Sequence, residues 1–525
     1  MTTRAELSTG EALVGLLEAY GVDTIFGIPG VHNVEMYRAL PRSRIAHVLV
    51  RHEQGAGFMA DGYARATGKP GVCFTITGPG LTNILTPMGQ AWSDSSNVLV
   101  ISSALDKVDS AQGRGRLHEM IDQRGAAGSV TSLHMRAYTP KDVRDAVARA
   151  FANFASQRPR PAYLEIPLDL LKEPAGDGWV ARGLPLRPSP SRAELEKAIA
   201  KLNGARRPVI ILGGGALHAG TSALKIAERL KAPIITTTAG KGAVPADHPL
   251  CLGYVMGREG VWDMLRQSDA ILCAGSELSE TDFWNDSVVI ERNLIRIDID
   301  ASVMSRPHTA EIAILGDAAE ALAMIAGGVT ERAGEARASF DLGEPDALRV
   351  MLAKVLEVIR AELPAETVIC SDMTQIAYAA NEIFPVSQPR TWLHPVGFGT
   401  LGFALPAGIG AKFGVGETPV AVLIGDYGLQ YTINELGTAA EHKLPLVILM
   451  WNNDALGQIR DDMVMKGIQP NAVTLRNPDF QALARAYGVN AEKPTTLAAL
   501  AQAIRRALSA DGPSLIEMTP RMVSG

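Results

Sequence analysis

The chain of 525 residues has few cysteines, and aromatic residues make up only 5% of it. Its four cysteines, Cys73, Cys251, Cys273 and Cys370, lie far apart, so no Cys-x-x-Cys pair is present to bind zinc. Three of the cysteines lie inside or beside apolar runs. We therefore expect all four to be buried free thiols, as in proteins of a reducing compartment.

The sequence also lacks long apolar runs and a basic surface. No run approaches the roughly 20 apolar residues that a membrane-spanning helix needs, and the N-terminal residues lack the pattern of a secretory signal. A net charge of −6 and a pI near 6.0 give no reason to expect binding to nucleic acid or anionic membranes. We expect a cytoplasmic protein that acts on small molecules, with no nucleic-acid or membrane partner.

Strand-like apolar runs alternate with helix-like segments along the chain. This alternation predicts an α/β fold with parallel sheets and right-handed crossovers. The length allows about three domains. A stretch rich in Pro and Arg at 181–192 and a polar stretch at 327–346 interrupt the alternation. The sequence therefore predicts three doubly wound parallel-sheet domains, at residues 1–182, 193–330 and 347–525.

Two apolar runs in the third domain end in glycine and polar residues. Residues 420–424 lead into Gly425-Asp426-Tyr427-Gly428, and residues 447–450 lead into Asn452-Asn453. Either ending alone would be an ordinary turn or loop. Two strands that end side by side would place both endings at one edge of a parallel sheet, where open α/β sheets bind ligands. The two endings together favour a binding site.

The chemistry of these endings suits a cation and a phosphate. Asp426 offers a carboxylate oxygen, Asn453 an amide oxygen and Ala455 a backbone carbonyl, and Mg²⁺ prefers hard oxygen ligands of this kind. The backbone N–H groups of Tyr427 and Gly428, which open a helix-like segment, would face phosphate oxygens. We therefore predict a magnesium and phosphate site at this edge.

These endings resemble the cofactor motif of the thiamin-diphosphate-dependent enzymes, in which Gly-Asp-Gly is followed further on by Asn-Asn. Tyr427 stands where members usually carry the third glycine. The resemblance covers almost the whole chain and is closest to the acetolactate synthase-like branch. It implies a pyrimidine-binding, a central Rossmann-like and a diphosphate-binding domain, with thiamin diphosphate and Mg²⁺ as cofactors. It also implies a homodimer or homotetramer with active sites between subunits. The segments that carry it are 51–57, 78–83, 397–406 and 477–480.

The resemblance assigns roles to single residues. Glu53 would hydrogen-bond the pyrimidine ring and favour the tautomer whose nitrogen acts as the local base; an isolated glutamate at this place would otherwise begin a helix in solvent. Gly399 would hold the pyrimidine amino group through its carbonyl. Leu401 would support the bend of the cofactor, where relatives usually have Met, and would also serve as core. The cofactor's diphosphate would be contacted by Thr374, Gln375, Gly425, Tyr427 and Gly428.

Other residues bear on the substrate. His32 and His118 occupy places that contact substrate in relatives, and either could return a proton after CO₂ leaves. A lone histidine more often lies on a solvated face. Carboxylates gathered on the same side would pair with a cationic substrate tail, because they bind guanidinium groups bidentately. The acidic candidates are Glu119, Asp122, Asp461 and Asp462.

Acetolactate synthases bind FAD in the central domain and carry a substrate-binding arginine there. This chain has Gly275-Ser-Glu-Leu-Ser-Glu-Thr-Asp-Phe283 at that place, so the arginine is missing and FAD is doubtful. Residues 114–119 and 453–463 also resemble the 2-ketoarginine (5-guanidino-2-oxopentanoate) decarboxylases. The leading hypothesis is a lyase dependent on thiamin diphosphate that decarboxylates a 2-oxo acid, 2-ketoarginine, to an aldehyde and CO₂. The alternatives are an acetolactate synthase-type carboligase that acts on pyruvate and a silent cofactor-binding homologue.

Overall fold

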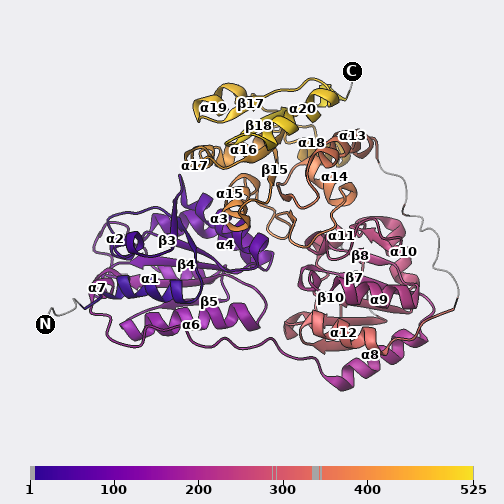
Figure 1. Cartoon of the computed structure of the whole chain (residues 1–525), viewed down its shortest axis with the longest axis horizontal. Coiled ribbons are helices and arrows are strands. Elements are labelled where there is room, and N and C mark those ends of the chain that lie inside the picture. The colour runs from indigo at the N-terminus through magenta and orange to yellow at the C-terminus, as the bar shows by residue number, and fades with distance from the viewer. Residues whose placement is uncertain are drawn as a thin grey trace.

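The chain folds into three parallel sheets joined by helices. The computed structural model describes residues 6–110, 112–285, 288–290, 292–333, 342 and 346–523. Within them lie three six-stranded sheets, and their strands pair in parallel throughout (Figure 1). The predicted α/β fold with three parallel sheets is therefore confirmed. No described helix is both long enough and apolar enough to cross a membrane.

The first sheet, indigo to violet in Figure 1, has the strand order β2-β1-β3-β4-β6-β5. Its strands are β1 (Thr24–Gly27), β2 (Ala46–Leu49), β3 (Gly71–Thr75), β4 (Val98–Ala104), β5 (Leu133–Arg136) and β6 (Ala162–Pro167). The accompanying helices are α1 (Thr9–Ala19), α2 (Val34–Tyr37), α3 (Glu53–Thr67), α4 (Pro79–Ser93), α5 (Gln123–Gly128), α6 (Pro140–Ser156) and α7 (Leu168–Lys172).

The third sheet, orange to yellow, has the order β14-β13-β15-β16-β18-β17. Numbered from its own first strand, it repeats the order of the first sheet. Its strands are β13 (Val368–Ser371), β14 (Trp392–Leu393), β15 (Val420–Gly425), β16 (Leu446–Trp451), β17 (Asn490–Glu492) and β18 (Ser514–Met518). Its helices are α13 (Ala347–Glu362), α14 (Gln375–Ile383), α15 (Ala404–Val415), α16 (Asp426–Thr432), α17 (Glu435–Glu441), α18 (Gly457–Met465), α19 (Phe480–Ala486) and α20 (Leu497–Leu508).

The central sheet has the order β12-β11-β10-β7-β8-β9, which is that of a dinucleotide-binding fold. Its strands are β7 (Pro208–Leu212), β8 (Ile234–Thr236), β9 (Cys251–Gly253), β10 (Ala270–Ala274), β11 (Leu294–Asp298) and β12 (Ile312–Leu315). Its helices are α8 (Arg192–Gly204), α9 (Gly220–Leu230), α10 (Glu259–Gln267), α11 (Glu280–Phe283) and α12 (Ala318–Gly328). Each sheet falls within one of the three predicted domain ranges, and the boundaries of these ranges stay predictions. Most of the polar stretch at 327–346 lies outside the described residues.

The expectation of four buried thiols needs one correction. Cys73, Cys273 and Cys370 are buried free cysteines on inner strands, whereas Cys251 is only half-buried. Cys251 begins β9, which is an edge strand of the central sheet and pairs with a neighbouring strand on one side only. An edge position therefore accounts for the difference.

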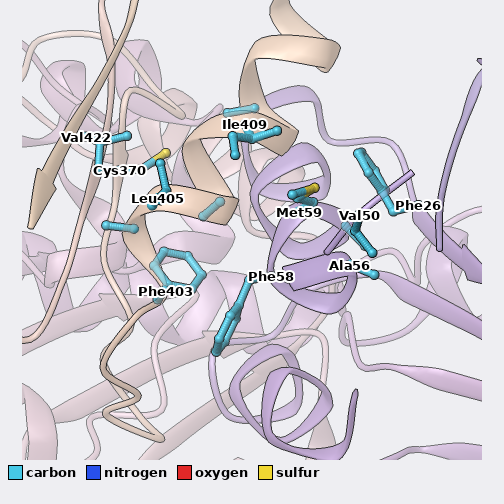
Figure 2. Packing of buried hydrophobic residues seen from close by; sticks show 14 of the residues in the cluster. Phe26, Val50, Ala56, Phe58, Met59, Cys370, Phe403, Leu405, Ile409 and Val422 are labelled. Carbon is cyan, nitrogen blue, oxygen red and sulfur yellow. The ribbon is translucent and has the colours of Figure 1, made fainter. Parts of the chain in front are cut away.

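The first and third domains are joined by the packing of α3 against α15. A Cβ at Gly62 would lie 2.1 Å from the backbone oxygen of Ala407, and a Cβ at Gly410 would lie 1.9 Å from that of Met59. The contact is thus reciprocal, with one glycine on each helix admitting the backbone of the other. Figure 2 shows Phe58 beside Phe403 in the apolar cluster that both domains share.

We expect the Gly410→Ala variant to be less stable, because the added methyl group has no space against the backbone of α3. Overpacking of this kind costs about 1–3 kcal/mol, which would appear as a lower midpoint in differential scanning calorimetry. Gly15→Ala is the matched control, since a Cβ on this residue of α1 meets nothing within 4 Å. That control should be neutral or stabilising. Equal midpoints for the two variants would contradict the close approach.

Candidate active site

The third sheet offers a binding edge where its strand order reverses. The chain runs from β13 to its neighbour β14 and then crosses to β15 on the other side, with β16 beside β15. In open α/β sheets, ligands bind beyond the carboxyl ends of the strands at such a reversal. Here β13 leads to Thr374, β15 leads to Asp426 and β16 leads to Asn453. Strand pairing thus brings these predicted site residues to one edge.

Asp426 is a buried carboxylate at this edge. It is 2% exposed, and its Oδ2 accepts a hydrogen bond of 2.7 Å from Asn477. Burial raises the pKa of Asp426, while the bond from Asn477 opposes that rise. A nearby cation would stabilise the ionised form of such a carboxylate. The same Asn477 amide nitrogen donates to Asn452 Oδ1 at 3.0 Å and to Asp454 Oδ1 at 3.1 Å. Asn477 was not predicted as a site residue.

Asn453 and Ala455 each present an oxygen that suits a cation. The Asn453 amide nitrogen donates to Gln375 over 3.1 Å, which leaves its Oδ1 for another partner. Ala455 forms an antiparallel bridge with Thr474 through backbone bonds of residues 454 and 456, so its own carbonyl is directed away from that bridge. Within the described residues no three His, Cys, Asp or Glu side chains are grouped to hold a metal. One carboxylate, one amide and one carbonyl, completed by phosphate and water oxygens, fit Mg²⁺.

The turn after β15 is tight. A Cβ at Gly425 would lie 2.9 Å from Thr374 Oγ1, and one at Gly428 would lie 3.2 Å from the carboxyl group of Asp372. Tyr427 lies within α16, its φ is not among the positive ones, and its ring packs on Tyr431 at 5.3 Å. The backbone at Tyr427 therefore does not require the glycine that relatives usually have.

Asp372 anchors the segment that carries Gly399 and Leu401. This carboxylate is fully buried and accepts hydrogen bonds of 3.0 Å from the backbone N–H of Gly402 and 3.2 Å from that of Ala404. Burial raises the pKa of Asp372 to about 6, against the effect of these donors. Gly399 has a φ of 62°, which favours glycine. Leu401 is half-buried, as suits a side chain that both packs and faces a ligand.

Glu53 is the first residue of α3 and is 8% exposed. Its Oε2 accepts a 2.9 Å hydrogen bond from Asn83 of α4. No described hydrogen bond or ion pair joins Glu53 to Asp426 or Asn453 of the same chain. Asn83 was not predicted as a site residue, although it ends the 78–83 segment.

The backbone just before Glu53 is held from the third domain. Glu435 is fully buried, and its Oε1 accepts hydrogen bonds of 3.1 Å from the backbone N–H groups of Arg51 and His52. A Cβ at Gly55 would lie 2.2 Å from this oxygen. Burial raises the pKa of Glu435, while its donors lower it. No local sequence pattern predicts this contact between domains.

His32 and His118 lie side by side on the first domain. Their ring centroids are 4.9 Å apart, at an interplanar angle of 69°. Among the described residues, the Nδ1 atom of each ring is buried without a hydrogen-bond partner. A Cβ at Gly78 would lie 2.6 Å from the His118 backbone oxygen, so this glycine lets the His118 loop approach. Because both Nδ1 atoms are shielded from solvent, contact of either ring with a substrate stays a prediction.

The acidic residues near His118 already have local partners. Glu119 accepts hydrogen bonds from the backbone N–H groups of Gly113 at 2.7 Å and Arg116 at 3.1 Å. Asp122 caps α5 and accepts from Gly125 at 2.8 Å. Both carboxylates therefore shape the loop that carries His118, and their contact with a substrate stays a prediction.

The acidic pair on α18 differs between its two members. Asp461 Oδ2 accepts from Gln375 at 2.8 Å, and its Oδ1 lies 3.1 Å from Arg460. Asp462 accepts from the neutral amide of Gln458 at 3.0 Å. Among the described residues Asp462 therefore forms no ion pair, whereas Asp461 pairs with Arg460.

The sequence left FAD in doubt, and the loops at the usual nucleotide place of the central domain lie close together. At the reversal between β7 and β10, a Cβ at Gly213 would lie 2.2 Å from the backbone oxygen of Gly275, and Gly215 N donates to the same oxygen at 3.0 Å. The two loops therefore lie in backbone contact at the reversal where a dinucleotide-binding fold holds its pyrophosphate. A cavity of about 960 Å³ lies between the first and central domains, but its Arg158 and Arg160 already pair with Glu277.

Comparison with known families identifies thiamin diphosphate, also called thiamine pyrophosphate (TPP), as the cofactor of the matching domains. The family described as thiamine pyrophosphate enzyme matches with three models. Its N-terminal TPP binding domain matches residues 7–126, its central domain 195–325 and its C-terminal TPP binding domain 372–518.

Individual proteins are similar over nearly the whole chain. The Pseudomonas aeruginosa protein named "Probable 2-ketoarginine decarboxylase AruI" is 46% identical, covering 99% of this chain and 95% of the relative. The acetolactate synthase large subunit of Corynebacterium glutamicum is 32% identical, covering 96% and 85%. The X-ray structure of a Mycobacterium smegmatis protein superposes with a TM-score of 0.84 at 23% identity, over 98% of this chain and 99% of that one, and so shares the fold.

We expect the ring of His32 to titrate below pH 6.5, because burial and the neighbouring His118 lower its pKa. His118→Ala should raise the pKa of His32 toward 6.5, as followed by NMR of ¹³C-labelled histidine rings. Since the pKa of His32 is lower in the folded than in the unfolded chain, its contribution to stability should decrease as the pH falls below 6.5. His134→Ala on β5 is the control; an unchanged His32 pKa in His118→Ala would contradict the coupling.

Proposed function

The chain belongs to the thiamine pyrophosphate enzymes, and on this basis we propose that it decarboxylates 2-ketoarginine to an aldehyde and CO₂. The main support is the 46% identity, over nearly the full length, to the Pseudomonas aeruginosa protein named as a probable 2-ketoarginine decarboxylase. The absence of the acetolactate synthase arginine from residues 275–283 supports the same choice over a carboligase.

The residues divide into two groups around the cofactor. Asp426, Asn453 and Ala455 would hold Mg²⁺, and Thr374, Gln375 and the turn 425–428 would hold the diphosphate. Glu53 would hydrogen-bond the pyrimidine, and Gly399 and Leu401 would fix the bend of the cofactor. When bound, thiamin diphosphate supplies the carbon nucleophile and accepts the electron pair released with CO₂.

The substrate side carries proton transfer and charge recognition. The rings of His32 and His118 lie in contact with each other, and we propose that one of the two returns a proton to the product. A guanidinium tail would favour carboxylates that keep their charge, and the partner of Asp462 is neutral. Asp462 is therefore the strongest of the acidic candidates, with Glu119, Asp122 and Asp461 more committed to local hydrogen bonds.

We also propose that the site is completed by a second copy of the chain. Glu53 makes no described polar contact with the Asp426 edge of its own chain. Large apolar side chains are exposed on both the first and the third domain. Ile121 is 95% exposed near His118, and Met465 is 77% exposed at the end of α18. Apolar exposure at this level marks interaction surfaces. A homodimer or a homotetramer would bring Glu53 of one copy to the Asp426 edge of another.

We expect Glu53→Gln to keep fold and cofactor binding but to lose decarboxylation by about 10²–10⁴-fold, the range for a group that acts in proton transfer. Cofactor binding can be followed by fluorescence titration and turnover by CO₂ release. Glu196→Gln, at a surface side chain 63% exposed, is the control for the loss of a carboxylate. Unchanged activity in Glu53→Gln would refute its assigned role, and silence of the native enzyme would favour a non-catalytic homologue.

A panel of 2-oxo acids should separate the candidate reactions. We expect kcat/KM for 2-ketoarginine to exceed that for a neutral acid of equal length by about 10- to 100-fold, since a charged hydrogen bond contributes about 1.5–3 kcal/mol. Asp462→Asn should reduce this preference. Acetolactate from pyruvate, with no turnover of 2-ketoarginine, would instead establish the carboligase.

A further inference from the structure

Gln375 lies between a predicted metal ligand and an acidic residue of α18. Its Oε1 accepts a hydrogen bond from Asn453 Nδ2 at 3.1 Å, and its Nε2 donates to Asp461 Oδ2 at 2.8 Å. Gln375 is 8% exposed at the start of α14. The three side chains thus form a continuous chain from the surface of α18 to the edge of the sheet.

The direction of these bonds is fixed by the carboxylate at one end. An ionised carboxylate can only accept hydrogen bonds, so Asp461 must face the NH₂ group of Gln375. The Gln375 oxygen then points the other way and can only accept, so it must face the NH₂ group of Asn453. The Asn453 oxygen is the atom left over, and it is the atom a cation needs. Reversing either amide would place two donors or two acceptors against each other.

The surroundings support this arrangement. A Cβ at Gly457, the first residue of α18, would lie 2.4 Å from Gln375 Oε1 and 2.7 Å from Asn453 Nδ2. A side chain here would therefore separate the two amides. The other oxygen of Asp461 accepts a hydrogen bond of 3.1 Å from Arg460, so both carboxylate oxygens have a donor.

We propose that Asp461 is a positioning residue that orients the Asn453 amide through Gln375, so that Asn453 Oδ1 faces the metal ion. This role replaces direct contact with the substrate for Asp461. It rests on the proposed Mg²⁺ site at Asp426, Asn453 and Ala455. Partners of this kind behind metal ligands typically change metal affinity by 10–100-fold.

The test is Mn²⁺ binding, which does not depend on turnover. The full-length enzyme, stripped of metal and supplied with saturating thiamin diphosphate, is titrated with Mn²⁺, and free Mn²⁺ is read by electron paramagnetic resonance. Asp461→Ala should weaken Mn²⁺ binding about tenfold, at the low end of that range because the Asp461 side chain is 44% exposed. Asp461→Asn keeps an acceptor for Gln375 and should bind nearly as the native enzyme does.

The neighbouring Asp462 gives a matched control. Asp462→Ala removes an equal charge from the same helix but no partner of Gln375, so its Mn²⁺ affinity should stay native. Equal weakening in Asp461→Ala and Asp462→Ala would show a general charge effect and overturn the proposal. So would native affinity in Asp461→Ala.

A double variant tests the path of the effect. Gln375→Leu alone and Gln375→Leu with Asp461→Ala should bind Mn²⁺ equally weakly, because the second change removes nothing further. Additive losses would mean that Asp461 acts without Gln375. Asp426→Ala separates failure of the metal site from failure of the positioning role. If Asp426→Ala still binds Mn²⁺ as the native enzyme does, the metal site is misassigned. If Asp426→Ala loses Mn²⁺ binding while Asp461→Ala keeps native affinity, only the positioning role is refuted.

Discussion

The close packing of α3 against α15 is the contact on which the arrangement of the site depends. Each helix carries a glycine that admits the backbone of the other, Gly62 against Ala407 and Gly410 against Met59. Both helices begin next to functional segments, since α3 starts at Glu53 and α15 follows Gly399 and Leu401. A change in the spacing of the helix pair would therefore move both segments together. The repeated strand order of the two domains explains why the contact is reciprocal.

Two buried carboxylates hold the backbone at the starts of α3 and α15. Asp372 accepts backbone N–H groups at the start of α15, and Glu435 accepts those just before α3. Burial raises the pKa of each carboxyl, so each anchor carries a desolvation cost that its backbone donors offset in part. The same backbone N–H groups would otherwise be unsatisfied at the buried start of a helix. Stability is thus given up locally to fix the entry to Glu53 and to the Gly399 segment.

Sequence reasoning succeeded where the signal was local and failed where it was not. Apolar runs that end in polar residues located Asp426 and Asn453, because parallel strands place their carboxyl ends at one edge. The adjacency of His32 and His118 depends on two loops that no sequence pattern connects. Glu435 likewise acts across domains, on a backbone far from it in sequence. Tyr427 departs from the glycine that relatives usually carry, yet it lies within helix α16, where a side chain is tolerated.

The four acidic candidates show why the number of carboxylates near a site in sequence does not predict which of them binds a cationic substrate. A carboxylate that accepts several backbone hydrogen bonds must give some of them up before it can bind a guanidinium bidentately, and each bond lost inside a loop costs stability. Glu119 and Asp122 organise the His118 loop in this way, and Asp461 is committed to Gln375 and Arg460. Within the part of the chain that the structure describes, the Asp462 carboxylate accepts from a neutral amide and forms no ion pair, so it can bind a substrate without breaking backbone hydrogen bonds of a loop. Recognition of a cationic tail should therefore depend on the one acidic residue that the fold needs least.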